Sequence, residues 1–250
     1  MKKNIFLLLA ALFTANVAFS HDADTLSNRD RVKVEHSIKM GLGIGASSPI
    51  PIPNRISEMS WTPHLGGLLG YRLHYLLNPK MSLKTGLQLQ HQGMSAEAKV
   101  YQMFTQANVE DAEVSGYFTG YNETKINATY LTVPLLISYS PSQKWNFDAG
   151  MFVAIKIQGH FSGAVKDGYI RIGEPTGDRV EVGYETFDFS DQVNPLSYGL
   201  LFAAERNIND HWSAWFDLSW ALNSAMKSSF NGLEYKMYNI YGFLGASYKL

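Results

Sequence analysis

The sequence predicts an all-β protein that folds as an eight-stranded antiparallel up-and-down transmembrane β-barrel. Three observations lead to this prediction. Apolar residues recur at every second position through eight separate segments, which is the period of a strand and not of a helix. Long polar stretches and short turns alternate between these segments. Within the segments the charged residues fall on one face, and the opposite face stays apolar between its ends.

The two closing segments show the alternation most clearly. In residues 211–222, bulky apolar side chains and alanine occupy every second position from Trp212 to Leu222, and the positions between them include two serines and Asp217. Residues 235–250 repeat the pattern. A strand of this length with one apolar and one polar face needs an apolar solvent on one side, and we take that solvent to be lipid. The other predicted strands are residues 37–46, 65–77, 81–90, 130–139, 145–158 and 197–205.

The connections between the segments alternate in length. Short turns are expected at residues 78–80, 141–144 and 207–210, and long polar stretches at 95–126 and 161–194. Short turns at one rim and long loops at the other, around an even number of strands, are typical of outer-membrane barrels. An even strand number puts both termini on the short-turn side, which predicts that both are periplasmic.

Proline modifies two parts of this pattern. Residues 47–63 contain four prolines, so we expect this segment not to form a paired central strand. Pro134 lies inside a predicted strand, where proline cannot donate a ladder hydrogen bond, and it therefore predicts a bulge.

The N-terminus has the pattern of an export signal, which we assign to residues 1–20. Lys2 and Lys3 precede a short apolar core, and residues 18–20 provide small residues at the positions expected of a cleavage site. Residues 21–36 are polar and are expected to form a periplasmic leader, and residues 37–250 the barrel domain. Without the signal the chain carries 19 basic and 22 acidic residues, a small net charge of −3 that argues against an electrostatic nucleic-acid binder.

The composition excludes several kinds of chemistry. The chain has 250 residues and no cysteine, which removes disulfides, thiolate metal sites and cysteine nucleophiles. The histidines are too scattered to indicate a metal site, and no glycine-rich phosphate loop follows a strand, so neither a metal nor another cofactor is expected. We therefore predict that the protein is not an enzyme.

The polar faces of the predicted strands carry charges of both signs. An eight-stranded barrel is just wide enough inside for side chains to fill it. We therefore expect a packed interior network of ion pairs and hydrogen bonds, in which three cations of consecutive strands pair with Asp148 and Asp217. Its predicted members are Lys39, Arg72, His74, Lys84, Asp148, Lys156, Glu205 and Asp217.

Aromatic residues near the strand ends predict two interfacial girdles. Trp212 and Trp220 lie on the same face eight residues apart, which is about 26 Å along a strand and roughly 20 Å in height at a 40° tilt. That height is close to the spacing of the two aromatic girdles of a transmembrane barrel. The predicted girdle residues are Tyr75, Tyr139, Trp145, Trp212, Trp220 and Tyr248.

Three stretches resemble a known family. Residues 130–139 (YLTVPLLISY), 147–150 (FDAG) and 242–250 (GFLGASYKL) are similar to Bacteroidetes outer-membrane β-barrel domain proteins of the PorT-like kind, within the wider OmpA/OmpX-type group. The resemblance implies an outer-membrane location among lipid and lipopolysaccharide. It also implies recognition of the C-terminal strand by the barrel-insertion machinery, although here the aromatic residue is Tyr248 and the chain ends at Leu250. A component of a secretion apparatus is a further function that the resemblance implies.

The long polar stretches carry the functional hypothesis. Together, residues 95–126 and 162–194 contribute a charge of −7, and they contain many aromatic residues. One interpretation is that they are solvated extensions of the strand hairpins, and the other is a surface for adhesion or partner docking, because aromatics within polar loops can anchor partners. The candidate contact residues are Tyr101, Phe104, Tyr117, Phe118, Tyr121, Tyr169, Tyr184 and Phe187.

Three alternatives to a plugged structural or adhesive barrel remain open at this point. The first is a narrow pore or secretion component. The second is a lipid A-modifying enzyme, since His160 and Ser162 have the His-x-Ser spacing of an outer-membrane lipid A deacylase, although the strand alternation predicts that both face the interior or a loop. The third is a soluble calyx whose apolar face points inward to a ligand.

Overall fold

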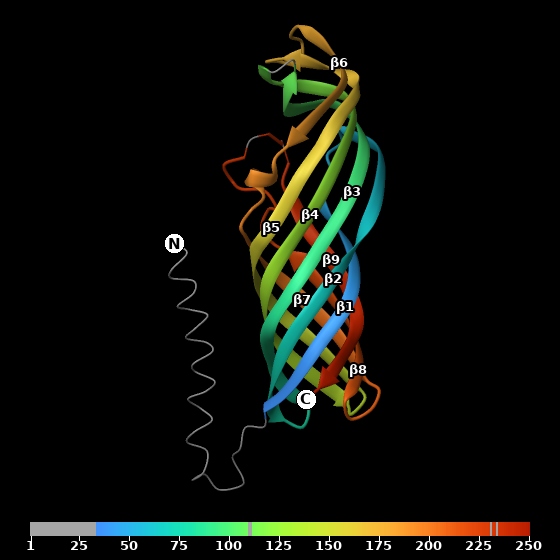
Figure 1. The fold of residues 1–250 in the computed structure, drawn as a ribbon, viewed down its shortest axis with the longest axis vertical. Coiled ribbons are helices and arrows are strands. Elements are labelled where there is room, and N and C mark those ends of the chain that lie inside the picture. The colour runs from blue at the N-terminus through green and yellow to red at the C-terminus, as the bar shows by residue number, and fades with distance from the viewer. Residues whose placement is uncertain (1–33, 110–111, 231, 234) are drawn as a thin grey trace. The chain divides into compact units, whose positions relative to one another are not determined.

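Eight strands close into a barrel in the computed structural model, which describes residues 34–109, 112–230, 232–233 and 235–250 (Figure 1). The ring follows the order β1, β2, β3, β4, β5, β7, β8 and β9, and antiparallel pairing of β1 with β9 closes it. The predicted fold is thereby confirmed. The strands are β1 (Val34–Pro49), β2 (Ile56–Asn78), β3 (Met81–Val109), β4 (Ala112–Ser142), β5 (Trp145–Ile172), β6 (Arg179–Asp188), β7 (Leu196–Asn207), β8 (Trp212–Ala221) and β9 (Met237–Lys249).

The expected signal and most of the leader, residues 1–33, lie outside the described part. The end of the leader is different from the expectation, because Val34, Glu35 and His36 already pair with β2 as the first residues of β1. Among the described residues, no helix is both long and apolar enough to cross a membrane.

The apolar faces of the strands point outward. Ile38, Met40 and Leu42 of β1 are exposed, whereas Lys39, between Ile38 and Met40, is buried inside the barrel. The same holds on β8, where Phe216 and Leu218 are exposed and Asp217 is buried. This confirms the predicted direction of the two faces and is the opposite of what a soluble calyx requires.

Because we take the solvent on this face to be lipid, a charge at its middle should be costly. Phe216 lies midway between Trp212 and Trp220 and is exposed. We expect Phe216→Arg to lower the free energy of unfolding by about 2–4 kcal/mol, measured by urea titration of the barrel in lipid vesicles. Leu77→Arg, next to the β2–β3 turn, is the matched control and should cost only about 0–1 kcal/mol. Equal losses for the two variants would contradict the outward orientation.

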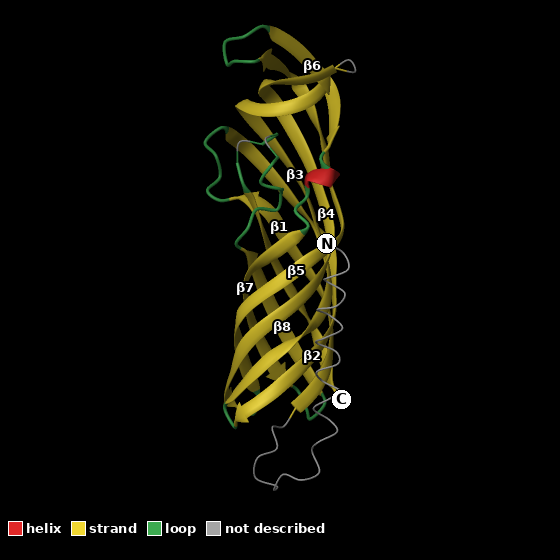
Figure 2. Ribbon diagram, turned by 90° about the vertical axis from the view of Figure 1, so that its left-hand side faces the viewer, coloured by secondary structure: helices red, strands yellow, loops and turns green. Residues whose placement is uncertain are grey.

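The walls of the barrel have unequal heights (Figures 1 and 2). β3, β4 and β5 contain 29, 31 and 28 residues, whereas β7, β8 and β9 contain 12, 10 and 13. The two long polar stretches are therefore mostly paired strand, which confirms the interpretation as hairpin extensions. The second stretch also contains a strand that we did not predict, β6, which pairs with the upper part of β5. We call the upper parts of β2 to β5, together with β6, the tall wall.

The proline-rich segment does not form a paired central strand, as predicted, but the bulge predicted at Pro134 is absent. The end of the proline-rich segment pairs with β3, from Ile56 opposite Val100 to Pro63 opposite Met94. Proline is tolerated there because the β1–β2 pairing ends at Gly43 and Gly66, so Pro63 lies on an edge that has only one neighbouring strand. Pro134 also remains in register with Phe152 of β5, without a bulge, and its carbonyl oxygen accepts a hydrogen bond from the Thr85 hydroxyl at 2.8 Å.

A bulge does occur in β5, one strand further on. Thr129 pairs with Gln158 but Tyr130 pairs with Lys156, so Ile157 is an extra residue in the ladder. An extra residue exchanges the two faces of the strand beyond it. As a result, Phe161 is buried inside the barrel and His160 is exposed on the outer surface.

Candidate functional site

A layer of buried charges crosses the lower half of the barrel interior. Lys39 Nζ lies 2.8 Å from Asp217 Oδ2, and Arg72 Nη2 lies 3.0 Å from the same oxygen. Lys84 Nζ lies 3.0 Å from Asp148 Oδ1 and 3.1 Å from Glu205 Oε2, while Arg72 Nη1 links the two halves at 3.5 Å from Asp148 Oδ2. We call these six residues the charged layer. Three cations face three carboxylates, so the layer is neutral as a whole.

Glycines on two strands make room for one part of this layer. A side chain at Gly41 would overlap the Trp215 ring, and one at Gly245 would overlap the backbone of β1. The Trp215 ring therefore packs against Gly41, and Lys39 Nζ sits 3.8 Å from the centre of one of its rings. A cation over an indole face is attracted by the ring quadrupole, so Trp215 adds to the binding of Lys39.

Two predicted members of the network lie outside the charged layer. The ring of His74 lies 3.3 Å from the hydroxyl of Ser37 in a half-buried position. Lys156 donates a hydrogen bond of 2.7 Å to the carbonyl oxygen of Val193, which belongs to the segment between β6 and β7. Lys156 thus binds a loop, and it does not pair with a carboxylate of the interior.

A layer of neutral polar residues lies above the charges. Thr132 donates to Gln90, and Gln90 donates to Gln88. In the opposite orientation of the Gln88 amide, its oxygen accepts from Arg72 Nη2 at 2.8 Å in place of the hydrogen bond from Gln90, so Gln88 can join either layer. This layer was not predicted from the sequence, because glutamine and threonine are as common on a solvated strand face as on a buried polar one.

An apolar plug closes the barrel above the polar layers. Met94, Ile126, Phe161 and Met237 from the strands pack against Val193, Ala225 and Met226 from the two segments that follow β6 and β8. An isolated bridge between Val193 and Met226 holds these two segments together. The described interior thus changes from charged to neutral polar to apolar with height.

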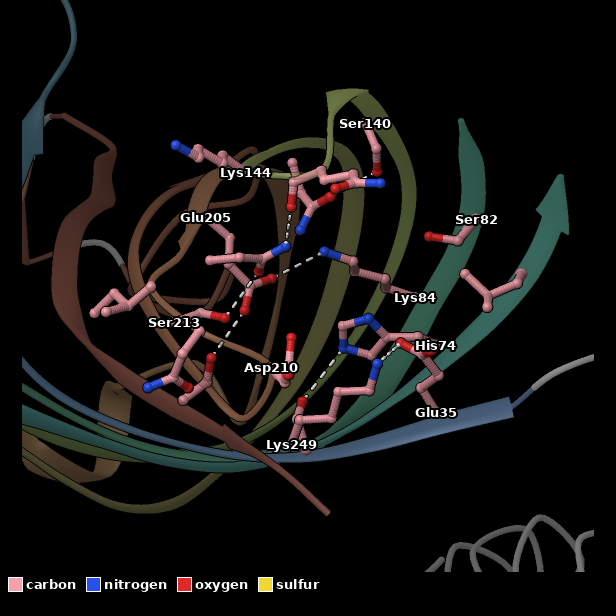
Figure 3. A pocket seen from close by; sticks show the side chains of 18 of the residues that line it. Glu35, His74, Ser82, Lys84, Ser140, Lys144, Glu205, Asp210, Ser213 and Lys249 are labelled. Atoms are coloured by element: carbon pink, nitrogen blue, oxygen red, sulfur yellow. Dashed lines mark hydrogen bonds and ion pairs between the residues drawn. The ribbon is translucent and has the colours of Figure 1, made fainter. Parts of the chain in front are cut away.

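Below the charged layer the barrel opens into a polar cavity of about 580 Å³ (Figure 3). Lys84 and Glu205 of the charged layer line its inner end. The ion pair between Lys249 and Glu35, with 2.7 Å between the charged atoms, lies at its mouth. Lining side chains of both signs are present, so the cavity selects for neither cations nor anions. None of the described histidine and acidic residues form a group that could hold a metal ion.

The tall wall has its own apolar core. Val100, Met103, Phe118, Val165, Ile170 and Val182 are buried together on the concave side of the wall. Of the eight candidate contact residues, Phe118 is therefore a core residue and not a contact residue. Tyr101 and Tyr184 are the most exposed, at 60% and 64%. Phe104, Tyr117, Tyr121, Tyr169 and Phe187 are half-buried.

The surface of the tall wall carries ion pairs that join its strands. Lys166 of β5 lies 2.8 Å from Glu97 of β3 and 3.7 Å from Glu123 of β4. The hydrogen bond from Lys166 to Glu97 raises the pKa of the lysine, and the hydrogen bond from Lys125 lowers the pKa of Glu123. Both groups therefore stay charged at neutral pH, and they link three strands across the sheet.

The family of the chain follows from a comparison with known proteins. A model of the outer membrane protein β-barrel domain matches residues 23–227. The chain belongs to this family. It is therefore an outer-membrane β-barrel. The lipid of that membrane is the apolar solvent that its outward apolar face requires. No curated protein matches the chain.

Solved structures of other outer-membrane barrels resemble this barrel in fold. Ail of Yersinia pestis, in complex with the heparin analogue sucrose octasulfate, is 10% identical with a TM-score of 0.37, over 87% of this chain and 97% of Ail. CarO2 of Acinetobacter baumannii is 11% identical with a TM-score of 0.36, over 86% and 99%. OprG of Pseudomonas aeruginosa is 12% identical with a TM-score of 0.31, over 88% and 97%. Similarities this distant do not bear on function.

The predicted girdle residues lie on the outer surface of this outer-membrane barrel. Trp145, Tyr139, Trp212 and Tyr248 are exposed beside the short turns, and Tyr75 is half-buried there. Trp220 is exposed near the upper end of β8, on the same face as Trp212. Two contacts tie the lower group together, because Trp145 stacks on Phe147 and Trp212 meets Tyr248 edge to face.

The expectation that His160 and Ser162 face the interior or a loop is wrong. The β5 bulge turns both toward the outer surface, where His160 is exposed and Ser162 half-buried. His160 Nε2 lies 3.0 Å from the side-chain nitrogen of Gln158. A nucleophile and its base need a hydrogen bond between them, and His160 contacts Gln158 instead.

Proposed function

We propose that this outer-membrane barrel is a surface-interaction protein, in which a filled barrel anchors the tall wall and the tall wall binds an extracellular polypeptide. The observation that supports it is the pairing of β3 with β4 and of β4 with β5, which continues far above the apolar band to the strand β6. β6 pairs with β5 on one side, and no described strand pairs with its other edge. An open strand edge can add a strand from a partner, with main-chain hydrogen bonds supplying affinity.

Charge and rigidity support the same role. The two long stretches, residues 95–126 and 162–194, carry a net charge of −7 together, so a basic partner is favoured. The apolar core of the tall wall and the cross-strand ion pairs of Lys166 hold the sheet in one shape. A partner then binds a preformed surface, and little conformational entropy is lost in ordering that surface.

In-register truncation tests the proposal. Val100 pairs with Gly120 and Lys166 pairs with Tyr184, so deleting residues 101–119 and 167–183 and joining each pair through a two-residue turn removes the top of both hairpins. Cells that display the wild type should adhere to immobilised basic polypeptides more than to acidic ones, and the truncated barrel should lower adhesion to the level of cells without the protein. Heat-modifiable migration checks that the truncated barrel still folds. Unchanged adhesion would refute the proposal.

The orientation of the barrel belongs to this proposal. The tall wall is extracellular, and the rim that carries the short turns, Val34 and Lys249 is periplasmic. An epitope inserted at the Gly173 turn should be accessible on intact cells, and one at the Asn209 turn only after the outer membrane is opened.

A narrow pore and a PorT-like secretion component are the alternative functions on this fold. The charged layer and the apolar plug fill the interior, so we expect no stable ion conductance from the purified barrel in a planar bilayer. Single-channel recording at 1 M salt measures this directly. Steady conductance steps from the wild-type barrel would favour the pore and contradict the plugged interior.

A further inference from the structure

We propose that a hollow beside the upper ends of β7 and β8, the two shortest strands of the ring, binds the phosphate of a membrane lipid headgroup. The hollow has a volume of about 770 Å³. Its lower border is apolar and aromatic, with Tyr198 and Leu222, and its upper border carries Lys227 and Lys236 from the segment between β8 and β9. This inference rests on the outer-membrane location of the barrel and is independent of what the tall wall binds.

The height of the hollow matches the boundary of the membrane. Leu222 is ten residues beyond Trp212, which is about 33 Å along a strand and roughly 25 Å in height at a 40° tilt. The apolar band of an outer-membrane barrel is about 25 Å tall. Trp212 and Trp220 are exposed near the two ends of β8, so the apolar band ends just below the hollow. Lipid phosphates lie directly beyond the hydrocarbon, which is where the two lysines are placed.

The two lysines lack an anionic partner among the described residues, unlike most other cations of the upper part. Lys99, Lys125, Lys166 and Arg179 all pair with carboxylates of the tall wall. Lys227 and Lys236 make no ion pair with the described residues, and the cavity wall between them carries serine hydroxyls at Ser228 and Ser229. A lipid phosphate would supply the missing anion and accept hydrogen bonds from these hydroxyls.

The base of the hollow is held in place by hydrogen bonds. The backbone nitrogen of Tyr198 donates to the Asn223 side chain at 2.9 Å, and that side chain donates to the carbonyl oxygen of Leu196 at 2.8 Å. The backbone nitrogen of Lys227 donates to the carbonyl oxygen of Gln192 at 2.8 Å. The segment that carries Lys227 is thus fixed to the segment before β7, and the lysine is presented on a preformed surface.

Phosphorylated lipids are favoured over a soluble anion because the hollow is continuous with the lipid-facing surface. Tyr198 and Leu222 are both exposed at the top of the apolar band. A lipid whose acyl chains lie against that band brings its phosphate to the lysines without leaving the bilayer. Each lysine near a charged membrane surface raises the affinity about fivefold, so two lysines raise it roughly 30-fold.

Native mass spectrometry of the full-length barrel in non-ionic detergent tests the inference. The probe is bis-phosphorylated lipid A, compared with the same lipid after removal of its phosphates and with inorganic phosphate at the same concentration. Wild type should retain one phosphorylated lipid per barrel, and the double variant Lys227→Gln with Lys236→Gln should bind it roughly 30-fold more weakly. The matched control is the variant Lys80→Gln with Lys144→Gln, which removes two exposed lysines at the opposite rim and should bind like wild type.

Each other outcome overturns the inference. Equal binding by the two double variants would show that the hollow is not the site. Equal retention of the lipid without phosphates would show that acyl chains alone are recognised. Binding of inorganic phosphate as tight as that of the lipid would show a site for a soluble anion. Adhesion through the tall wall is measured separately on cells, so failure of one proposal is distinguishable from failure of the other.

Discussion

Asp217→Ala is expected to lower the free energy of unfolding by about 3–5 kcal/mol, because it leaves buried charges without their partner. Asp217 Oδ2 lies 2.8 Å from Lys39 Nζ and 3.0 Å from Arg72 Nη2, and the three side chains are at most 3% exposed. Urea titration of the folded barrel, followed by tryptophan fluorescence, measures the loss.

Two controls separate a buried charge effect from loss of a contact. Glu181 pairs with Arg179 on the exposed surface of the tall wall, so Glu181→Ala should cost no more than about 1 kcal/mol. The double variant Lys39→Met with Asp217→Leu should recover part of the stability that Asp217→Ala loses, because apolar side chains of similar volume remove the unpaired charge. An Asp217→Ala loss as small as that of Glu181→Ala would show that water reaches the charged layer.

Phe161→Ala is expected to cost about 3–5 kcal/mol, which is typical of removing a buried aromatic side chain. Phe161 is 2% exposed, and its ring centre lies 6.3 Å from those of both Phe187 and Phe189 in the apolar plug. The same urea titration measures the change. Tyr184→Ala, at an exposed position on β6, is the control and should stay within about 0.5 kcal/mol of wild type.

The Phe161 variant also tests where the barrel is sealed. Loss of the ring should accelerate hydrogen exchange of amides in the upper interior, around Ile126 and Met237, because the plug then opens more often. Amides of the charged layer, near Asp148 and Asp217, should exchange as slowly as in the wild type. Faster exchange in both layers would mean that the plug and the charged layer unfold as one unit.

The fold and the direction of its faces were predictable from sequence because the membrane imposes one rule on every strand. A charge on the lipid side is costly, so Lys39, Lys84 and Asp217 could each be assigned to the interior from alternation alone. Which cation pairs with which carboxylate in the charged layer was only partly predictable. Lys156 illustrates the limit, because its partner is a backbone carbonyl of a connecting segment, and no side-chain pattern marks such a partner.

The features that were not predicted depend on a local irregularity of a strand or on contacts with residues far away in the sequence. The β5 bulge at Ile157 has no glycine or proline signal, yet it changes the face on which His160 and Phe161 lie. Phe118 looked like a loop aromatic, because the concave side of the tall wall that buries it forms only when β6 folds back against β5. Alternation within one strand cannot reveal a second apolar core built above the membrane.

The unequal wall heights have a consequence for how neighbouring molecules can gather around the barrel. On the side of β7, β8 and β9, the protein ends close to the lipid surface, so bulky sugar chains or adjacent proteins can lean across its rim. On the side of β3, β4 and β5, the projecting sheet keeps such neighbours at a distance. The barrel therefore has two unlike sides within the plane of the bilayer, and a molecule that approaches the rim of the tall wall has a preferred direction of approach.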